Sequence, residues 1–225
     1  MAISPALFEF LSDLKDNNNR DWFKKNKDRY DKVVKEPLLA FIADFGEQVP
    51  VISPHIIAVP RVNGGSMFRI YRDVRFSKDK TPYKTAAAVQ FRHERGKDVH
   101  APGYYLHLEP DSVYAGCGIW KPDSETVYKI RSRIINHPDE WKKSSRKPPF
   151  IDAFTLGGDS LKRPPRGFDP EHPLIEDLKM KDYIGSVELN EKIVCQNDFV
   201  DYYIDLCKKA APFMEFLTGS LGLAW

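Results

Sequence analysis

Residues 67–85 hold the side chains best suited to chemistry in this sequence. Six cations lie there against two acids, although the whole chain has a net charge of only +2. The cations are Arg69, Arg72, Arg75, Lys78, Lys80 and Lys84. An arginine fork can donate to two phosphate or carboxylate oxygens at once, and a lysine adds a point charge. This basic stretch therefore predicts a binding site for an anionic small molecule.

The basic stretch also allows other interpretations. Asp73 and Asp79 can neutralise the cations in a salt-bridge network, which would make the charge structural. Tyr71 and Tyr83 can stack on bases, so the stretch also suits nucleic acid, with an affinity that falls steeply as salt rises. A protein-interaction module for an acidic partner is the third alternative. For an anionic ligand, we expect Tyr83 to line the site beside the six cations.

A candidate acid–base pair lies on a strand predicted for residues 104–109. Side chains alternate along a strand, so Tyr105, His107 and Glu109 share one face. A neutral histidine that a carboxylate orients can act as a general base near pH 7. His107 and Glu109 are therefore the candidate catalytic residues. The alternative is a hydrogen-bonded histidine on a half-buried sheet, without a catalytic role.

The next strand, predicted for residues 113–120, decides whether this pair has room for a ligand. A turn at residues 110–112 joins the two strands into a hairpin. Small and aromatic residues share one face of the second strand: Tyr114, Gly116, Gly118 and Trp120. If the two faces coincide, His107 and Glu109 lie over small residues and a ligand fits above them.

A loop with two consecutive prolines supplies further cations. The prolines stiffen residues 161–172 and fix the directions of Arg163 and Arg166. Both arginines are candidate ligand-binding residues in a second wall of the same anion site. The alternative is an extended surface segment that packs through Phe168.

Several better-defined chemistries are excluded. The chain has no GxxxxGK[ST] loop for nucleotide phosphates, and the Gly116-Cys117-Gly118 segment lacks the third glycine of a dinucleotide turn. Its six histidines include no HExxH pair. Its three cysteines include no CxxC pair, so neither a metal site nor a disulfide framework is expected. We predict no cofactor.

Helices at both ends of the chain and strands between them must position these groups. Apolar residues at every third or fourth place predict helices that begin after Ser4, Asn19 and Asn197. Strands are predicted for residues 85–93, 104–109, 113–120 and 183–189. This order predicts a single α+β domain over residues 1–225, with an antiparallel sheet flanked by N- and C-terminal helices.

Length and composition are those of an ordinary soluble protein. A domain of 225 residues can bury about 70% of its unfolded surface, so it needs neither disulfides nor metal to fold. The N-terminus lacks the basic and apolar runs of a signal peptide. No segment approaches the roughly 20 apolar residues that span a bilayer. We therefore expect a cytoplasmic protein without a membrane partner, and the sequence leaves its oligomeric state open.

The long basic motif at residues 68–84 resembles the hallmark of the family known as domain of unknown function 2461. Shorter blocks along the chain are similar to other motifs of that family: residues 8–11, 20–23, 104–108, 116–120 and 162–167. The resemblance covers nearly the whole chain. It implies a soluble single-domain protein, and it supplies no established activity or catalytic residue to carry over.

Overall fold

The structure, a computed structural model, describes residues 2–96 and 101–225. Its strands are β1 (Ile56–Ile57), β2 (Ala87–His93), β3 (Gly103–Glu109), β4 (Ser112–Ile119), β5 (Thr155–Gly157) and β6 (Tyr183–Leu189). Within the described residues they form one six-stranded sheet in the order β1-β2-β3-β4-β6-β5. Every neighbouring pair is antiparallel. The predicted α+β fold with an antiparallel sheet is confirmed.

The helices lie before, between and after the strands. They are α1 (Pro5–Asp16), α2 (Arg20–Lys25), α3 (Lys27–Tyr30), α4 (Glu36–Gln48), α5 (Ser124–Asn136), α6 (Pro138–Arg146), α7 (Ile175–Lys179), α8 (Glu191–Val194) and α9 (Phe199–Ser220). A π-helical turn, Asp31–Lys35, joins α3 to α4, and a 3-10 turn, Val49–Val51, follows α4. None of the helices in the described part of the chain is long and apolar enough to cross a membrane.

Two of the three predicted helix starts, after Ser4 and after Asn19, agree with the structure. Pro5 takes the first position of α1 after Ser4, and the Asn19 side chain accepts a hydrogen bond from a backbone N–H of α2. The prediction of Asn197 as the cap of α9 is wrong, because the helix begins one residue later, after Asp198. There the N–H of Phe199 donates to the backbone carbonyl of Gln196, so a backbone turn replaces the side-chain cap.

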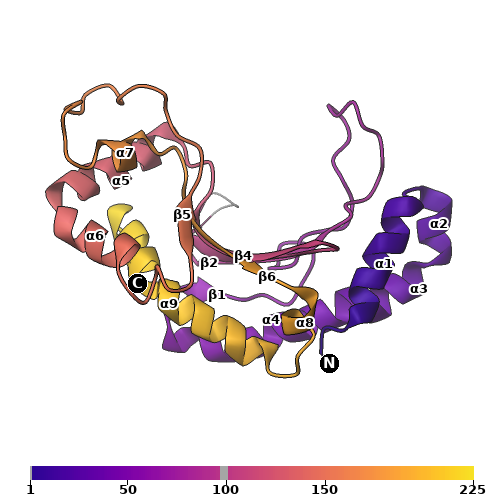
Figure 1. Cartoon of the computed structure of the whole chain (residues 1–225). Coiled ribbons are helices and arrows are strands. Elements are labelled where there is room, and N and C mark those ends of the chain that lie inside the picture. The colour runs from indigo at the N-terminus through magenta and orange to yellow at the C-terminus, as the bar shows by residue number, and fades with distance from the viewer. Residues whose placement is uncertain (1, 97–100) are drawn as a thin grey trace.

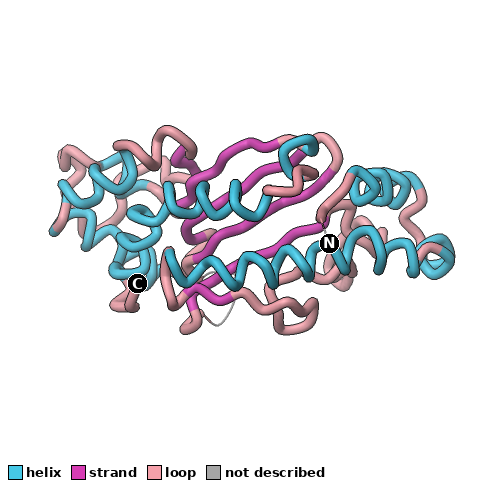
Figure 2. The backbone as a smooth tube through the Cα atoms, turned by 90° about the horizontal axis from the view of Figure 1, so that it is seen from below, coloured by secondary structure: helices cyan, strands magenta, loops and turns pink. Residues whose placement is uncertain are grey.

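Helices α4 and α9 cover one face of the sheet, and Figure 2 shows two long helices crossing the strands on that side. Aromatic rings fill the space between these layers. Phe45 of α4 stacks on Phe91 of β2 with ring centroids 4.0 Å apart, and Tyr203 of α9 lies 5.4 Å from Phe45. The core of the protein lies on this side of the sheet.

The opposite face of the sheet is open between two groups of helices. In Figure 1, α5, α6 and α7 stand at one end of this face and α1, α2 and α3 stand at the other. The alternation of β3 reflects the difference between the two faces. Leu106 and Leu108 are buried beside the helices, whereas Tyr105, His107 and Glu109 are only partly buried on the other side.

The basic stretch belongs to the long connection from β1 to β2, which rises from the sheet near α1–α3 (Figure 1). Backbone hydrogen bonds fold it back on itself: Arg72 N–H donates to the Pro82 carbonyl, and Lys84 N–H donates to the Ile70 carbonyl. Tyr83 at its base is buried and stacks on Phe23 of α2, with centroids 4.1 Å apart. The residues after Tyr83 are thereby held at the edge of the open sheet face.

The Asn18 side chain fixes this base to the turn between α1 and α2. Its amide donates to the Tyr83 carbonyl at 3.0 Å, and its oxygen accepts from the Tyr83 N–H at 3.1 Å. We expect Asn18→Ala to lower the free energy of unfolding by about 1–2 kcal/mol, because two partly buried backbone groups lose their partners. Urea unfolding measures this change, and hydrogen exchange should show faster exchange at the Tyr83 amide.

Asn17→Ala is the matched control for this variant. Asn17 is exposed, and its side chain donates to the Asp13 carbonyl one turn earlier. Its replacement should change the stability by no more than about 0.5 kcal/mol. Equal losses for the two variants would show that the contact to Tyr83 does not hold the base of the basic stretch.

Candidate functional site

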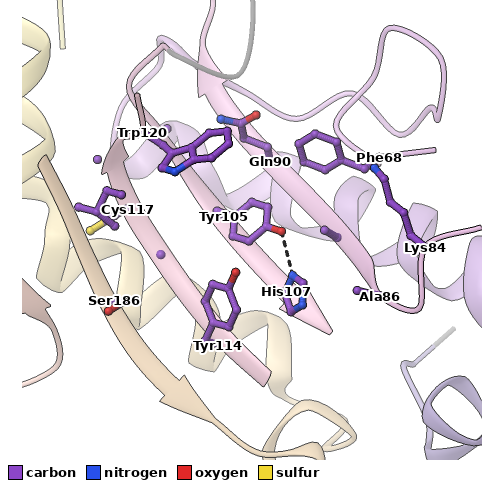
Figure 3. A pocket seen from close by; sticks show the side chains of 15 residues that line it. Phe68, Lys84, Ala86, Gln90, Tyr105, His107, Tyr114, Cys117, Trp120 and Ser186 are labelled. Carbon is purple, nitrogen blue, oxygen red and sulfur yellow. Dashed lines mark hydrogen bonds between the residues drawn. The ribbon is translucent and has the colours of Figure 1, made fainter. Parts of the chain in front are cut away.

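A cavity of about 590 Å³ opens on the uncovered face of the sheet. Alternate residues of β2, β3, β4 and β6 form its floor, and the base of the basic stretch forms one side (Figure 3). Aromatic rings dominate its lining: Phe68, Tyr105, His107, Tyr114 and Trp120. The cavity therefore offers mainly ring faces and a few polar groups to a ligand.

The predicted faces of β3 and β4 lie on the same side of the sheet, so Tyr105 and His107 share that side with Tyr114 and Gly116. Tyr105 lies opposite Gly116, and His107 lies opposite Tyr114. A Cβ atom at Gly116 would meet nothing closer than 3.7 Å, so the backbone does not demand glycine there. The missing side chain at Gly116 instead leaves the space above the strand empty.

A chain of hydrogen bonds leads to the floor of this cavity from Thr85 and Glu109, which lie outside its lining. The Thr85 hydroxyl donates to Glu109 Oε1 at 2.6 Å, and Glu109 Oε2 lies 3.3 Å from His107 Nε2. His107 Nδ1 lies 2.9 Å from the Tyr105 hydroxyl (Figure 3). An ionised carboxylate only accepts hydrogen bonds, so Nε2 of a neutral His107 carries the proton and the Tyr105 hydroxyl donates to Nδ1. This arrangement orients the histidine ring and connects it to a tyrosine hydroxyl.

The surroundings shift the pKa values of Glu109 and Tyr105 in opposite directions. Burial by itself would raise the pKa of Glu109, but hydrogen bonds from Thr85 and His107 outweigh it and lower that pKa. Burial raises the pKa of Tyr105, and the nearby Tyr114 and Glu109 add to the effect. Glu109 is thus kept as a carboxylate and Tyr105 as a neutral phenol near pH 7.

The lowered pKa of Glu109 predicts a pH-dependent contribution to stability. A carboxyl whose pKa falls on folding stabilises the protein above its unfolded pKa of about 4.3, and this contribution is lost as the pH falls through the folded value. Glu109→Gln removes the titration. We expect it to cost about 1 kcal/mol at pH 7, since the carboxylate is partly exposed.

Urea unfolding of both proteins between pH 7 and pH 3 measures this contribution. The difference in the free energy of unfolding should shrink toward zero as the pH falls below about 4. A difference that stays constant over the whole range would mean that hydrogen bonding to Glu109 does not depend on its charge.

Lys84 is the cation of the basic stretch that reaches the cavity. It is half-buried, and its amine lies 5.2 Å from the centroid of the Phe68 ring. Burial lowers the pKa of Lys84, and the positive charge of Arg69 lowers it further. Lys84 therefore places a basic amine at one side of a cavity that is lined largely by aromatic rings.

Two of the predicted ligand-binding arginines are paired within the basic stretch itself. Arg75 donates twice to the Asp73 carboxylate, and Arg72 contacts both Asp79 and Thr81. The hydrogen bonds from Arg75 hold the pKa of Asp73 at about 2. The backbone and side chain of Thr81 and the Arg72 guanidinium together hold that of Asp79 at about 2. The salt-bridge interpretation describes Arg72 and Arg75, and neither lines the cavity.

The remaining predicted ligand-binding residues also lie outside the cavity lining. Arg69, Lys78 and Lys80 are exposed on the basic stretch, and the Lys80 amine donates to the Val74 carbonyl. Arg163 and Arg166 are exposed on the loop between β5 and α7, and neither contributes to a second wall of this cavity. Their role in ligand binding stays a prediction.

The expectation that Tyr83 faces a ligand needs correction. Only 5% of its surface is exposed, and its ring packs between Phe23 and Tyr71. The spacing of aromatic and basic residues did not reveal that α2 supplies a partner for this ring. Tyr83 anchors the base of the basic stretch.

The sequence analysis did not single out seven of the lining residues: Phe68, Ala86, Ala88, Gln90, Gly103, Ile184 and Ser186. Gln90 follows from the alternation of the predicted strand at residues 85–93, which puts Ala86, Ala88 and Gln90 on one face. Ser186 could not be found in this way. It enters the cavity because β6 pairs with β4 and places Ser186 opposite Gly116, a long-range contact that no local pattern encodes.

Within the described residues, no group of three or more histidine, cysteine, aspartate or glutamate side chains is arranged to hold a metal ion. The chemistry that the cavity offers is therefore that of its own side chains. Glu109, His107 and Tyr105 can move a proton, and Lys84 can attract an anion or supply an amine.

Comparisons with known proteins identify a family without an assigned activity. A family model described as a conserved hypothetical protein (DUF2461) matches residues 6–216. No curated protein and no solved structure gives a significant match. The matched region includes every residue that lines the cavity, and the resemblance inferred from the sequence motifs is confirmed.

Proposed function

The chain belongs to the DUF2461 family, and we propose that it binds a small molecule with a flat, largely apolar body and a phosphate or carboxylate group. The observation that carries this proposal is the cavity on the open sheet face, with aromatic walls and the half-buried Lys84 at one side. Because ring faces favour other flat groups and Lys84 favours negative charge, the two features select for the same kind of ligand.

The hydrogen-bonded chain that leads to the cavity floor supports an enzymatic function. A general base needs a carboxylate-oriented histidine within reach of the bound molecule. Glu109 orients His107, and the Tyr105 hydroxyl contacts the other ring nitrogen of His107 within the cavity (Figure 3). In the proposed reaction, Tyr105 exchanges a proton with the ligand while His107 accepts or returns one.

A cytoplasmic location agrees with this proposal. Cys117, Cys195 and Cys207 are all free thiols, as is usual in a reducing compartment. Soluble metabolites with carboxylate or phosphate groups are abundant in such a compartment.

A thermal-shift screen tests the proposed ligand class. The panel contains terephthalate and phenyl phosphate as flat anions, benzyl alcohol as an uncharged flat compound, and inorganic phosphate as an anion without a ring. A ligand at 100 times its dissociation constant stabilises the folded state by about 2.7 kcal/mol. We expect stabilisation by the flat anions and little by the other two probes.

Other outcomes would replace the proposal. Stabilisation by benzyl alcohol as strong as that by terephthalate would remove the role of Lys84 in selecting an anion. Failure of every flat anion to stabilise the protein at millimolar concentration would remove the proposed ligand class.

Single-stranded nucleic acid is a second candidate, favoured by the tip of the basic stretch. Phe76 is 95% exposed there, the Arg75 guanidinium lies 5.8 Å from its ring centroid, and Lys78 is exposed nearby. Exposed rings among cations suit stacked bases and phosphates. This function predicts binding of short single-stranded RNA or DNA that weakens steeply between 50 and 200 mM salt, the range over which phosphate contacts lose about 10³–10⁵ in affinity.

A fluorescence-anisotropy titration with a labelled oligonucleotide separates the candidates. Binding that is lost in Phe76→Ala and that falls with salt would support nucleic acid. Absence of binding at low salt would reject it and leave an acidic protein partner as the remaining role for the exposed tip.

A further inference from the structure

We propose that the ε-amine of Lys84 forms an imine with an aldehyde or ketone that also carries a carboxylate or phosphate group. This inference rests on the ligand site proposed above and names the reactive class of its ligand. It assigns Lys84 a covalent role in addition to its charge.

The position of Lys84 is the first argument. It lies at the edge of the cavity, half-buried, with its amine beside the Phe68 ring (Figure 3). Among the described residues, no carboxylate pairs with this amine, whereas Lys27 and Lys129 on the helices each have an acidic partner. The amine of a lysine with a purely structural role normally lies in solvent or beside a carboxylate. The Lys84 side chain is half-buried, and among the described residues no carboxylate forms an ion pair with it.

The charge around Lys84 is the second argument. The positive charge of Arg69 acts on the Lys84 amine, and the Lys84 N–H donates to the carbonyl of Ile70, the residue after Arg69. Burial and this neighbour lower the pKa of Lys84, which increases the fraction of neutral amine near pH 7. Desolvation and a second cation are the two ways in which a lysine becomes a nucleophile.

The reaction balances without a further reagent. The lone pair of the neutral Lys84 amine attacks the carbonyl carbon, and the carbonyl π electrons move to the oxygen. The resulting carbinolamine loses its oxygen as water, with two protons from the amine nitrogen, and a C=N bond forms. Tyr105 and His107 line the same cavity and share a hydrogen bond, and they are the groups that would deliver and accept these protons.

Reductive trapping with 4-carboxybenzaldehyde tests the proposal. This probe is flat and anionic and carries an aldehyde, and sodium cyanoborohydride converts any imine into a stable secondary amine. Peptide mass mapping then locates the adduct. We expect Lys84 to be labelled at least about tenfold faster than the exposed Lys78, because binding in the cavity places the aldehyde beside the amine.

Two variants and one matched compound make the test specific. Lys84→Arg keeps the charge and should abolish the fast labelling. Gly116→Leu keeps the amine but fills the cavity, and it should slow the labelling of Lys84 to the rate of Lys78. Terephthalate has nearly the same shape and no aldehyde, so an excess of it should protect Lys84.

The results separate this proposal from the proposed function. Lys84 labelling no faster than that of Lys78, with terephthalate still stabilising the protein, would overturn the imine and leave the ligand site intact. Equally fast labelling of Lys84 in Gly116→Leu would also overturn it, since the reactivity would not depend on the cavity. Neither labelling nor stabilisation would overturn both.

Discussion

Replacing Gly118 by alanine is expected to destabilise the fold by about 3 kcal/mol or more, because backbone strain and overpacking act at the same position. Gly118 has a φ of +117°, which L side chains rarely adopt. A Cβ atom there would lie 2.0 Å from the Tyr183 carbonyl oxygen on the neighbouring strand β6. The atoms that this Cβ would meet belong to the backbone of Tyr183 and Ile184, so they cannot move aside without separating β4 from β6.

Gly116→Ala, two residues earlier on the same strand, is the control. Its Cβ would have only ordinary contacts, at 3.7 Å from the Gly185 oxygen and 3.8 Å from Tyr105 Cβ. Urea unfolding should give this variant a stability within about 0.5 kcal/mol of the parent chain. Similar midpoints for the two alanine variants would show that the β4–β6 pairing tolerates a side chain at Gly118.

Gly116→Leu is expected to lower the affinity for terephthalate about 100-fold or more, which corresponds to about 2.7 kcal/mol. The leucine side chain would project from the floor into the volume that the missing Cβ leaves empty. The fold should remain stable, because the position has room for a Cβ and the rest of the leucine side chain would enter the cavity. Isothermal titration calorimetry measures the affinity, and a melting curve measures the stability.

Gly157→Ala provides the comparison outside the cavity. It lies on the edge strand β5, and a Cβ atom there meets nothing within 4 Å. Terephthalate should bind this variant as it binds the parent chain. Unchanged binding to Gly116→Leu, with binding retained in Gly157→Ala, would place the ligand outside the cavity and would reject the proposed function.

The pattern of side chains along the sequence determined the elements and the faces of the central hairpin. The strand predicted for residues 183–189 has the bounds of β6. The alternation of Tyr105, His107 and Glu109 was sufficient to predict that they share a face. These features depend on neighbours a few residues apart, which is the range over which periodicity and turn signals act. The expectation that small residues lie opposite His107 was wrong, because the register places Tyr114 opposite His107 and Gly116 opposite Tyr105.

The tertiary structure decided which cations could reach a ligand. Arg72 and Arg75 are cations of the same basic stretch as Lys84, yet Asp79 and Asp73 of that stretch pair with them, whereas the Lys84 backbone folds back onto the sheet edge. Tyr83 lies in the core and not in the cavity, because its ring stacks on Phe23 of α2. Ser186 lines the cavity because β6 pairs with β4. Composition showed that charge was concentrated in one stretch. Which of those charges face a cavity depends on contacts between segments far apart in the chain, and no local pattern encodes them.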